Sequence, residues 1–309
     1  MTHKIHLDTD IGGDIDDLCA LALLLRWPEP VQLTGVTSVG DMNGRRAGYA
    51  RYVLDREGLQ DVPVAAGADI SGGYYPYELG LPPEALYWPE AVPPLPTGSD
   101  AALELLKNSI EQGASIVAIG PYTNLYLLDC KYPGILGQAT VVLMGGFVEP
   151  PRPGYPDWKN EFDFNIQVDM RSAGHVLRNS SATLVTLPVT AETALPRSFL
   201  PALHGGDWLA RLIARQSEQF ALDEQMEEKY GKTCPALPAD IINFMYDPLA
   251  CAVALGWEGV EVQDIPLVIE EVDGWLVERH DSAGKPLRVV TKVDGPGFGR
   301  FWLERVLGK

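Results

Sequence analysis

Five aspartates lie within ten residues near the start of the chain, between an apolar strand pattern and an apolar helix pattern. They are Asp8, Asp10, Asp14, Asp16 and Asp17. Carboxylates this close repel one another, and a fold normally avoids that cost unless a cation or a shared proton neutralises them. One or two could cap the following helix by accepting hydrogen bonds from its free N–H groups. Capping does not account for five, so the segment indicates a metal site or a catalytic site.

Two known acidic motifs do not fit this segment. An EF-hand loop counted from Asp8 would need an acidic or amide side chain at its fifth position and Glu at its twelfth, where Gly12 and Cys19 stand. A phosphatase with a DxDx(T/V) motif would use Asp8 as its nucleophile, but its fifth position is again Gly12. That chemistry also needs a distant acidic pair, whereas here the pair Asp16-Asp17 follows at once.

The elements that must position these aspartates alternate along the chain, with short β-branched runs between helical patterns. The alternation predicts an α/β fold with a mostly parallel central sheet covered by helices on both faces, and ligands in such sheets bind beyond the carboxyl ends of the strands. No linker is visible, so one domain over residues 1–309 is expected. The predicted strands are 4–7, 32–38, 115–119, 140–144, 183–187, 260–269 and 287–293, and the predicted helices are 18–26, 45–56, 101–112, 171–177, 207–222, 248–255 and 299–306.

Three segments lack core patterning and are predicted to form loops around the ligand site. They are 70–99, which is rich in Pro, Tyr and Gly, the Pro-rich segment 147–161, and 223–237, where Tyr230 is a candidate aromatic contact.

Composition restricts the ligand and the compartment. The formal net charge is -18 and the 24 Lys and Arg residues are scattered, which argues against nucleic acid and favours a neutral or cationic small molecule. The four cysteines form no CxxC pair, so structural zinc is not expected. No signal-peptide core or membrane-spanning run is present, so we expect no membrane partner and a cytoplasmic location.

Together with four further stretches, the aspartate segment resembles the nucleoside hydrolases, the family of inosine-uridine preferring N-ribohydrolases. The stretches occur in the family's order, each at a predicted strand end or helix start. The resemblance implies a Rossmann-like nucleoside hydrolase fold, a nucleoside substrate and a homodimer or homotetramer. The four stretches are Ile119 to Leu125 (IGPYTNL), Val141 to Gly146 (VVLMGG), Phe162 to Ile166 (FDFNI) and Tyr246 to Ala250 (YDPLA).

The resemblance also implies a calcium ion (Ca²⁺) held by oxygen ligands, as a hard cation prefers. By motif matching the ligands are Asp10, Asp17, the backbone carbonyl of Ile119 and Asp247, and Asp16 faces the ribose hydroxyls. This chain has two more residues between its DxD and DD than the commonest family pattern, so Asp14 is a rival for either role. Asp247 before Pro248 is also a common helix start, and capping and metal binding need not exclude each other.

The remaining residues implied by the resemblance contact the nucleoside. Asp163, where the family usually has Glu, and Asn165 would hold the 3'- and 5'-hydroxyls of the ribose. Both could instead end a strand in a turn, since each residue type bonds its own backbone. Met144 would line the pocket, and Asp41 is a weaker candidate for contact with the base or the ribose.

The largest departure from the family is Tyr246, which stands where the inosine-uridine preferring enzymes have the His thought to protonate the leaving base. A phenol with a pKa near 10 is a poor acid at neutral pH, whereas its ring can stack on a purine. Tyr246 is therefore the catalytic position whose role the sequence leaves open.

The resulting hypothesis is hydrolysis of the N-glycosidic bond of ribonucleosides to free base and ribose. In this scheme Asp10 takes the proton of a calcium-oriented water in a direct displacement. One alternative is a hydrolase of modified or nicotinamide-type N-ribosides, suggested by Tyr246 and by an aromatic loop that contains Tyr74, Tyr75, Tyr77, Tyr87 and Trp88. Another is a metal-dependent ribose or nucleoside binding protein without catalysis.

Overall fold

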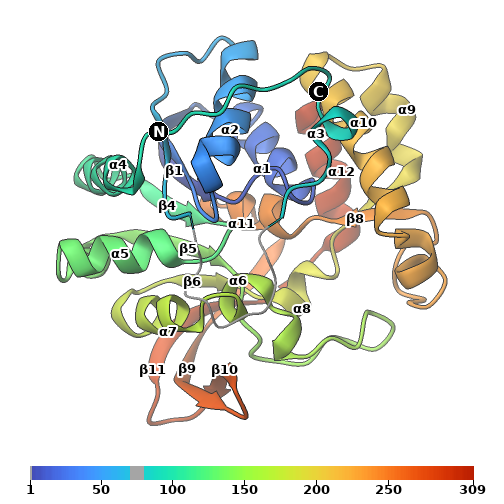
Figure 1. Cartoon of the computed structure of the whole chain (residues 1–309). Helices are drawn as coiled ribbons and strands as arrows, with labels where there is room; N and C mark the ends of the chain where they lie inside the picture. Colours follow the sequence, from blue (N-terminus) through green and yellow to red (C-terminus); the bar gives the residue numbers. More distant parts are fainter. Residues whose placement is uncertain (1, 70–79) are drawn as a thin grey trace.

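A single nine-stranded sheet forms the centre of the protein in a computed structural model that describes residues 2–69 and 80–309 (Figure 1). The strand order is β10-β9-β11-β6-β5-β4-β1-β2-β3, and β7 and β8 form a separate antiparallel pair. The strands are β1 (His3–Thr9), β2 (Val31–Ser38), β3 (Val64–Ala66), β4 (Ser115–Ala118), β5 (Thr140–Met144), β6 (Thr183–Val185), β7 (Ala194–Pro196), β8 (Ile241–Phe244), β9 (Val260–Val272), β10 (Trp275–His280) and β11 (Lys285–Val293).

Helices cover both faces of this sheet. They are α1 (Asp16–Leu25), α2 (Arg45–Arg56), α3 (Glu84–Tyr87), α4 (Ser99–Glu111), α5 (Thr123–Lys131), α6 (Phe164–Gln167), α7 (Met170–Asn179), α8 (Leu187–Thr190), α9 (Leu200–His204), α10 (Trp208–Asp223), α11 (Tyr246–Ala254) and α12 (Gly295–Val306). In the main sheet, neighbouring strands are parallel in the series β11, β6, β5, β4, β1, β2 and β3. The pairings of β9 with β11 and of β9 with β10 are antiparallel. The predicted α/β class with a mostly parallel sheet is confirmed.

The alternation of side chains along the strands builds two apolar layers. In β4, Val117 packs into the layer formed with α1, α2, α10, α11 and α12, whereas Ile116 and Ala118 pack into the layer formed with α4, α5 and α7. Residues 16–24 of α1 are all buried, so this helix lies inside the molecule rather than on its surface. Its N-terminus, which carries Asp16 and Asp17, is therefore buried with it.

Several elements differ from the sequence prediction. The predicted strand 183–187 ends at Val185, and Leu187 begins α8 with Pro188 in the first turn, a position where proline is tolerated. The short strands β3, β7 and β8, the hairpin strand β10 and the helix α5 were not predicted. Each is short or has weak amphipathic patterning, so its own residues carry too little periodicity to predict it.

The predicted aromatic loop does not surround the ligand site as a whole. Tyr87 and Trp88 are buried, and Trp88 stacks on Tyr49 with ring centroids 4.4 Å apart, because both pack into the apolar core. Assigning these two residues to a loop around the ligand site was therefore wrong. Tyr74, Tyr75 and Tyr77 lie outside the described residues.

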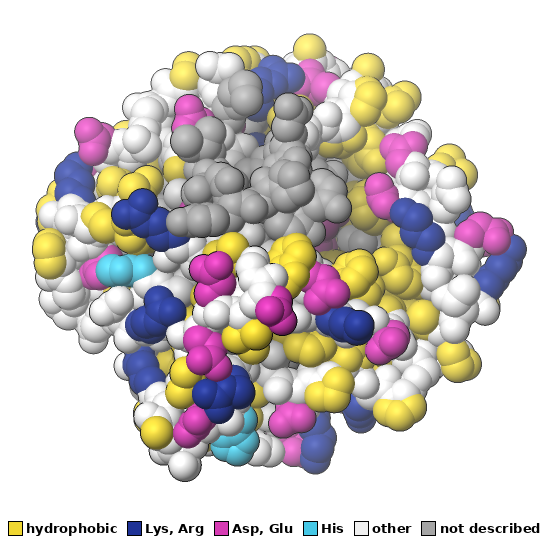
Figure 2. All heavy atoms as spheres, turned by 60° about the horizontal axis from the view of Figure 1, so that its bottom comes forward, with side chains coloured by type: hydrophobic (Ala, Val, Ile, Leu, Met, Phe, Trp, Pro, Cys, Tyr) yellow, Lys and Arg dark blue, Asp and Glu magenta, His cyan; other side chains and the backbone are white. Residues whose placement is uncertain are grey.

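The surface agrees with the scattered charge of the sequence. On the face shown in Figure 2, Lys and Arg side chains are dispersed among Asp and Glu side chains and form no basic stripe. None of the helices over residues 2–69 and 80–309 is long and apolar enough to cross a membrane.

A buried polar chain connects β1 to its neighbours beneath the aspartate segment. Thr37 Oγ1 donates to Asp8 Oδ1 at 2.5 Å and so accepts from His6 Nε2 at 2.9 Å, while His6 Nδ1 lies 2.8 Å from Ser109 Oγ. These contacts place a proton on Nε2, and Nδ1 can accept from the hydroxyl of Ser109 when the imidazole is neutral. Burial lowers the pKa of His6 from 6.5 to about 3.

His6 should therefore make the fold sensitive to acid. The unfolded chain takes up the imidazole proton below about pH 6.5 and the folded chain only near pH 3, so stability is lost as pH falls through this window. Urea denaturation at pH 8 and pH 5 should show that wild type loses up to about 2 kcal/mol more than His6→Gln. The exposed His204→Gln control should follow wild type. Parallel losses in wild type and His6→Gln would contradict this role.

Candidate functional site

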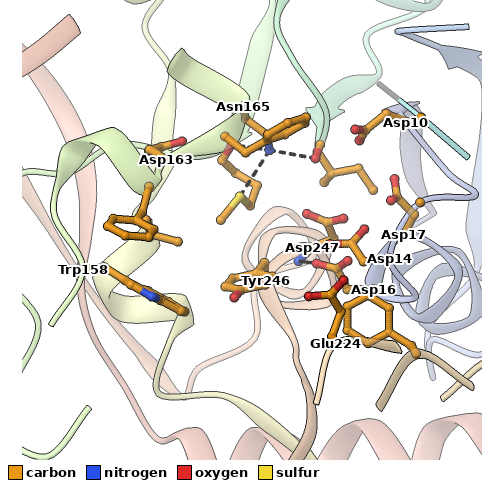
Figure 3. Close-up of a pocket in the computed structure, with 18 of the residues that line it drawn as sticks. Asp10, Asp14, Asp16, Asp17, Trp158, Asp163, Asn165, Glu224, Tyr246 and Asp247 are labelled. Carbon is orange, nitrogen blue, oxygen red and sulfur yellow. Dashed lines mark hydrogen bonds between the residues drawn. The ribbon is translucent and has the colours of Figure 1, made fainter. Parts of the chain in front are cut away.

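A cavity of about 440 Å³ opens at the carboxyl ends of β1, β4 and β5, where the amino ends of α1, α6 and α11 converge. In Figure 3, Asp10, Asp14, Asp16, Asp17 and Asp247 gather on one side, and Trp158 and Asp163 lie opposite them. The described residues that line it are Asp10, Gly13, Asp14, Asp16, Asp17, Arg46, Gly80, Ile119, Met144, Trp158, Phe162, Asp163, Phe164, Asn165, Leu187, Phe220, Glu224, Tyr230, Tyr246 and Asp247.

Asp10 follows β1 directly and lies against the backbone that follows β4. A β-carbon at Gly120 would come within 2.7 Å of Asp10 Oδ1, so only glycine leaves room for this carboxylate. Arg46 of α2 donates to the backbone carbonyls of Asp10 and Ile11 and thereby holds the loop. Burial raises the pKa of Asp10 to about 7, although the positive charge of Arg46 acts in the opposite direction.

Asp16 and Asp17 begin α1, and carboxylate oxygens of Asp14, Asp16 and Asp17 lie within 4.8 Å of one another. Asp17 Oδ1 accepts a hydrogen bond from Thr9 Oγ1. Asp16 Oδ2 lies 3.4 Å from the backbone nitrogen of Asp247, whereas Asp16 Oδ1 is buried with no partner among the described residues. Asp16 and Asp17 are 2% and 1% exposed, so water does not replace the hydrogen bond that Asp16 Oδ1 lacks.

Asp247 reaches the same place from the other end of the chain because α11 packs along α1. It lies in the first turn of α11 and is 4% exposed. Burial, followed by the charges of Asp16 and Asp17, raises the pKa of Asp247 well above its usual range. Burial and neighbouring carboxylates likewise raise the pKa values of Asp16 and Asp17.

This group of oxygen donors suits a hard divalent cation. Several buried carboxylates held close together cannot all be ionised at low cost, and a cation removes that cost. The unpartnered Asp16 Oδ1 and the raised pKa values are what such a donor set shows when its charge is not balanced by protein groups. The residues present therefore fit the calcium ion that the sequence resemblance implies.

The backbone carbonyl of Ile119 and the side chains of Met144 and Asn165 lie side by side in the pocket wall. Asn165 Nδ2 donates to the carbonyl oxygens of Ile119 at 2.8 Å and Met144 at 3.1 Å, as the dashed lines of Figure 3 show in part. These bonds fix the orientation of the amide. The structure thus places all three predicted residues at the pocket.

Asp163 lies at the start of α6, on the wall opposite the carboxylate group. Its Oδ1 and Oδ2 accept from the backbone nitrogens of Ile166 and Gly146. Burial raises the pKa of Asp163 to about 6. Asp163 thus caps α6 and also holds the backbone after β5. It follows a 3₁₀ turn over 160–162 rather than a strand, so the interpretation that it ends a strand was wrong.

Tyr246 belongs to an aromatic group with Trp158, Tyr230 and Phe244. Its ring centroid lies 5.3 Å from that of Phe244 and 6.1 Å from that of Trp158. Burial is the main cause that raises the pKa of Tyr246 well above its usual value, and Tyr230, Asp16 and Asp14 add to it. A phenol that holds its proton so firmly is a poor proton donor at neutral pH.

Asp41 is the one predicted site residue that the structure does not bring to the pocket. Its Oδ1 accepts from the backbone nitrogen of Arg46 at 2.9 Å, and its Oδ2 accepts from Ala47 N at 2.8 Å and Ser38 Oγ at 2.6 Å. The side chain thus binds the free N–H groups at the start of α2. Its position after a strand end looked the same in the sequence as that of Asp10.

Several lining residues escaped the sequence analysis, among them Trp158, Arg46 and Glu224. Trp158 was the single tryptophan of the Pro-rich segment 147–161, a signal that could have selected it. Glu224 directly follows α10 and lies in segment 223–237, which was predicted to border the ligand site, but nothing singled it out there. Arg46 lies within a regular helical pattern and carried no signal. Their place in the pocket depends on how α2 and α10 pack.

Comparisons with known proteins find relatives over nearly the whole chain. The family model described as inosine-uridine preferring nucleoside hydrolase matches residues 5–300. The pyrimidine-specific ribonucleoside hydrolase RihA of Shewanella baltica (strain OS155) is 32% identical over 96% of this chain and 94% of its own, and that of Salmonella arizonae is 30% identical over 99% of each.

Two solved structures have the same fold. A plant nucleoside hydrolase, PpNRh1, superposes with a TM-score of 0.79 at 17% identity and covers 99% of both chains. The purine-preferring ribonucleoside hydrolase from Gardnerella vaginalis has a TM-score of 0.78 at 22% identity, over 99% of this chain and 98% of its own.

The contrast between Asp16 and Asp41 gives a test of the carboxylate repulsion. Both are 2% exposed, but Asp16 has an unpartnered oxygen, whereas Asp41 accepts three hydrogen bonds. With chelator at pH 8, Asp16→Asn should raise the melting temperature by about 2–5 °C, because it removes one buried charge. Asp41→Asn should lower the stability by about 2 kcal/mol, because donors then face an amide NH₂. Destabilisation by both variants would refute the repulsion argument.

Proposed function

The chain belongs to the family of inosine-uridine preferring nucleoside hydrolases, and we propose that it hydrolyses the N-glycosidic bond of ribonucleosides to free base and ribose in a calcium-dependent reaction. One observation carries the proposal. Asp10, Asp17 and Asp247, from opposite ends of the chain, meet at one side of a cavity whose other wall holds Asp163 and Asn165.

The proposed binding of the ribose uses both walls. Asp16 would accept hydrogen bonds from ribose hydroxyls on the side of the carboxylate group, with Asp14 as its rival. Asn165, oriented by its bonds to Ile119 and Met144, and Asp163 would contact the hydroxyls on the opposite side. A ribose held between the two walls presents C1' to Asp10.

The proposed calcium ligands are Asp10, Asp17, the carbonyl of Ile119 and Asp247. When bound by these residues, a calcium ion would supply positive charge that orients hydroxyl and water oxygens and makes a water more acidic. Asp10 then takes the proton of the attacking water while the bond between C1' and the base nitrogen breaks. Tyr246, Trp158 and Tyr230 provide ring surfaces beside the departing base and exclude water from it.

The reaction is tested with a panel of uridine, cytidine, inosine, adenosine and guanosine in the presence of Ca²⁺. Purified protein should release ribose, measured as reducing sugar, from at least one of them. Asp10→Asn should lower kcat by a factor of about 10²–10⁴ because the base is removed. The matched control Asp55→Asn, an exposed residue of α2 paired with Arg51, should leave kcat unchanged. Stoichiometric nucleoside binding without product would instead support a binding protein.

Calcium dependence is tested independently of turnover. Ca²⁺ at about a hundred times its dissociation constant should stabilise chelator-treated wild type by about 2.7 kcal/mol, seen as a higher melting temperature. Asp247→Asn should reduce or abolish this shift, whereas Asp55→Asn should retain it. Chelator should stop ribose release and added Ca²⁺ should restore it. Full activity after exhaustive chelation would rule out the metal.

A further inference from the structure

The pocket contains more negative charge than the proposed metal and ribose contacts require. Among the described residues that line it, seven carry carboxyl groups and one, Arg46, carries a guanidinium. A divalent cation would offset only part of this charge. Asp16 Oδ1 is buried and without a described partner, which marks this wall as one that meets a ligand.

Glu224 has no part in the proposed metal and ribose contacts, and Asp14 takes part in them only as the rival of Asp16. Figure 3 shows both residues beside Asp16, on the same side of the cavity as Tyr246. Asp14 is exposed to the opening, and its charge acts on both Tyr246 and Asp16. Glu224 directly follows α10 and lies near enough to Asp14 and Tyr230 to act on each of them. Negative charge therefore faces the region that the rings enclose.

The rings themselves form a continuous wall. The centroids of Trp158 and Tyr230 are 5.7 Å apart, and both rings pack against Phe244, at 5.0 Å and 5.1 Å. Trp158, Tyr230 and Tyr246 line the pocket, while Phe244 is 1% exposed and supports them from behind. Aromatic faces with carboxylates beside them attract cations more strongly than aromatic faces alone.

The chemistry of the leaving group points the same way. A neutral nucleoside needs a proton donor, because its base would otherwise depart as an anion. Tyr246 stands at the position of the family's His, and a phenol, whose ordinary pKa is near 10, is a poor proton donor at neutral pH. None of the described residues that line the pocket is a histidine. A base that already carries a positive charge needs no donor, because the electron pair of the breaking C1'–N bond neutralises it.

We propose that the preferred substrates are ribosides whose base carries a permanent positive charge, such as N-alkylated or pyridinium bases. Glu224 and Asp14 then face that charge from beside the aromatic wall. The inference rests on the proposed N-glycosidic hydrolysis. Water oxygen bonds to C1', the C1'–N electron pair passes to the base nitrogen, and the base leaves neutral. The water proton goes to Asp10 and then to solvent, so each turnover releases one proton.

The test separates charge from shape by using two probes. Nicotinamide riboside is a permanent cation, and its dihydro form is neutral with the same ribose and carboxamide. Binding is measured by calorimetry in the Asp10→Asn background with Ca²⁺. That background should bind the cation at least tenfold more tightly than the dihydro form. Adding Glu224→Gln should weaken binding of the cation about five- to tenfold and change binding of the dihydro form less than twofold. Adding Asp14→Asn should also weaken binding of the cation more than binding of the dihydro form. The exposed Glu258→Gln control should change neither.

Turnover distinguishes failure of this inference from failure of the proposed function. Wild type with Asp10 intact should cleave nicotinamide riboside with one proton released per ribose in a pH-stat, and uridine with none. Equal binding of both probes, or equal weakening of both by Glu224→Gln, would overturn the charge preference even if uridine is cleaved. Failure to cleave nicotinamide riboside and all five nucleosides of the panel above would overturn the hydrolase function itself.

Discussion

Repulsion among buried carboxylates is the constraint on which this molecule depends. The loop after β1 and the amino ends of α1 and α11 bring Asp10, Asp16, Asp17 and Asp247 to one pocket, where the last three are buried. The surrounding protein tolerates this cost because the sheet and the buried α1 fix the backbone, and because Gly120 leaves space for Asp10. A fold that holds like charges together has a place ready for a cation.

The same negative field shapes the rest of the pocket. It raises the pKa of Tyr246 beyond what burial alone would do, and this removes the phenol as a proton donor. The departure from the family's His is therefore more than the loss of one acid, because it changes which leaving groups the site can release. In the proposed scheme the site does not donate a proton to the base; the ring wall and the carboxylates of Asp14 and Glu224 attract a base that is already positively charged.

Much of the fold was visible in the sequence because its signals are local. The strands β1, β2, β4, β5 and β11 and the helices α1, α2, α4, α10 and α12 appeared as runs of buried β-branched residues or as helical periodicity, within a few residues of their true ends. The short β3, β7 and β8 were not visible, because three or four residues carry too little pattern. Tyr87 and Trp88 looked like loop residues because their packing into the apolar core, where Trp88 stacks on Tyr49, has no local signature.

The sequence by itself determined the chemistry available here: an excess of acidic oxygens at strand ends, an ordered set of family motifs and a tyrosine in place of histidine. Only the tertiary structure decided which residues share the pocket. It placed Asp41 at the start of α2 and brought Arg46 to the cavity from a helix without any functional pattern. It also selected Trp158 and Glu224 from two long segments in which the sequence singled out neither residue. The reason is that residue type and spacing are local properties, whereas proximity across two hundred residues depends on how α1, α10 and α11 pack on one sheet.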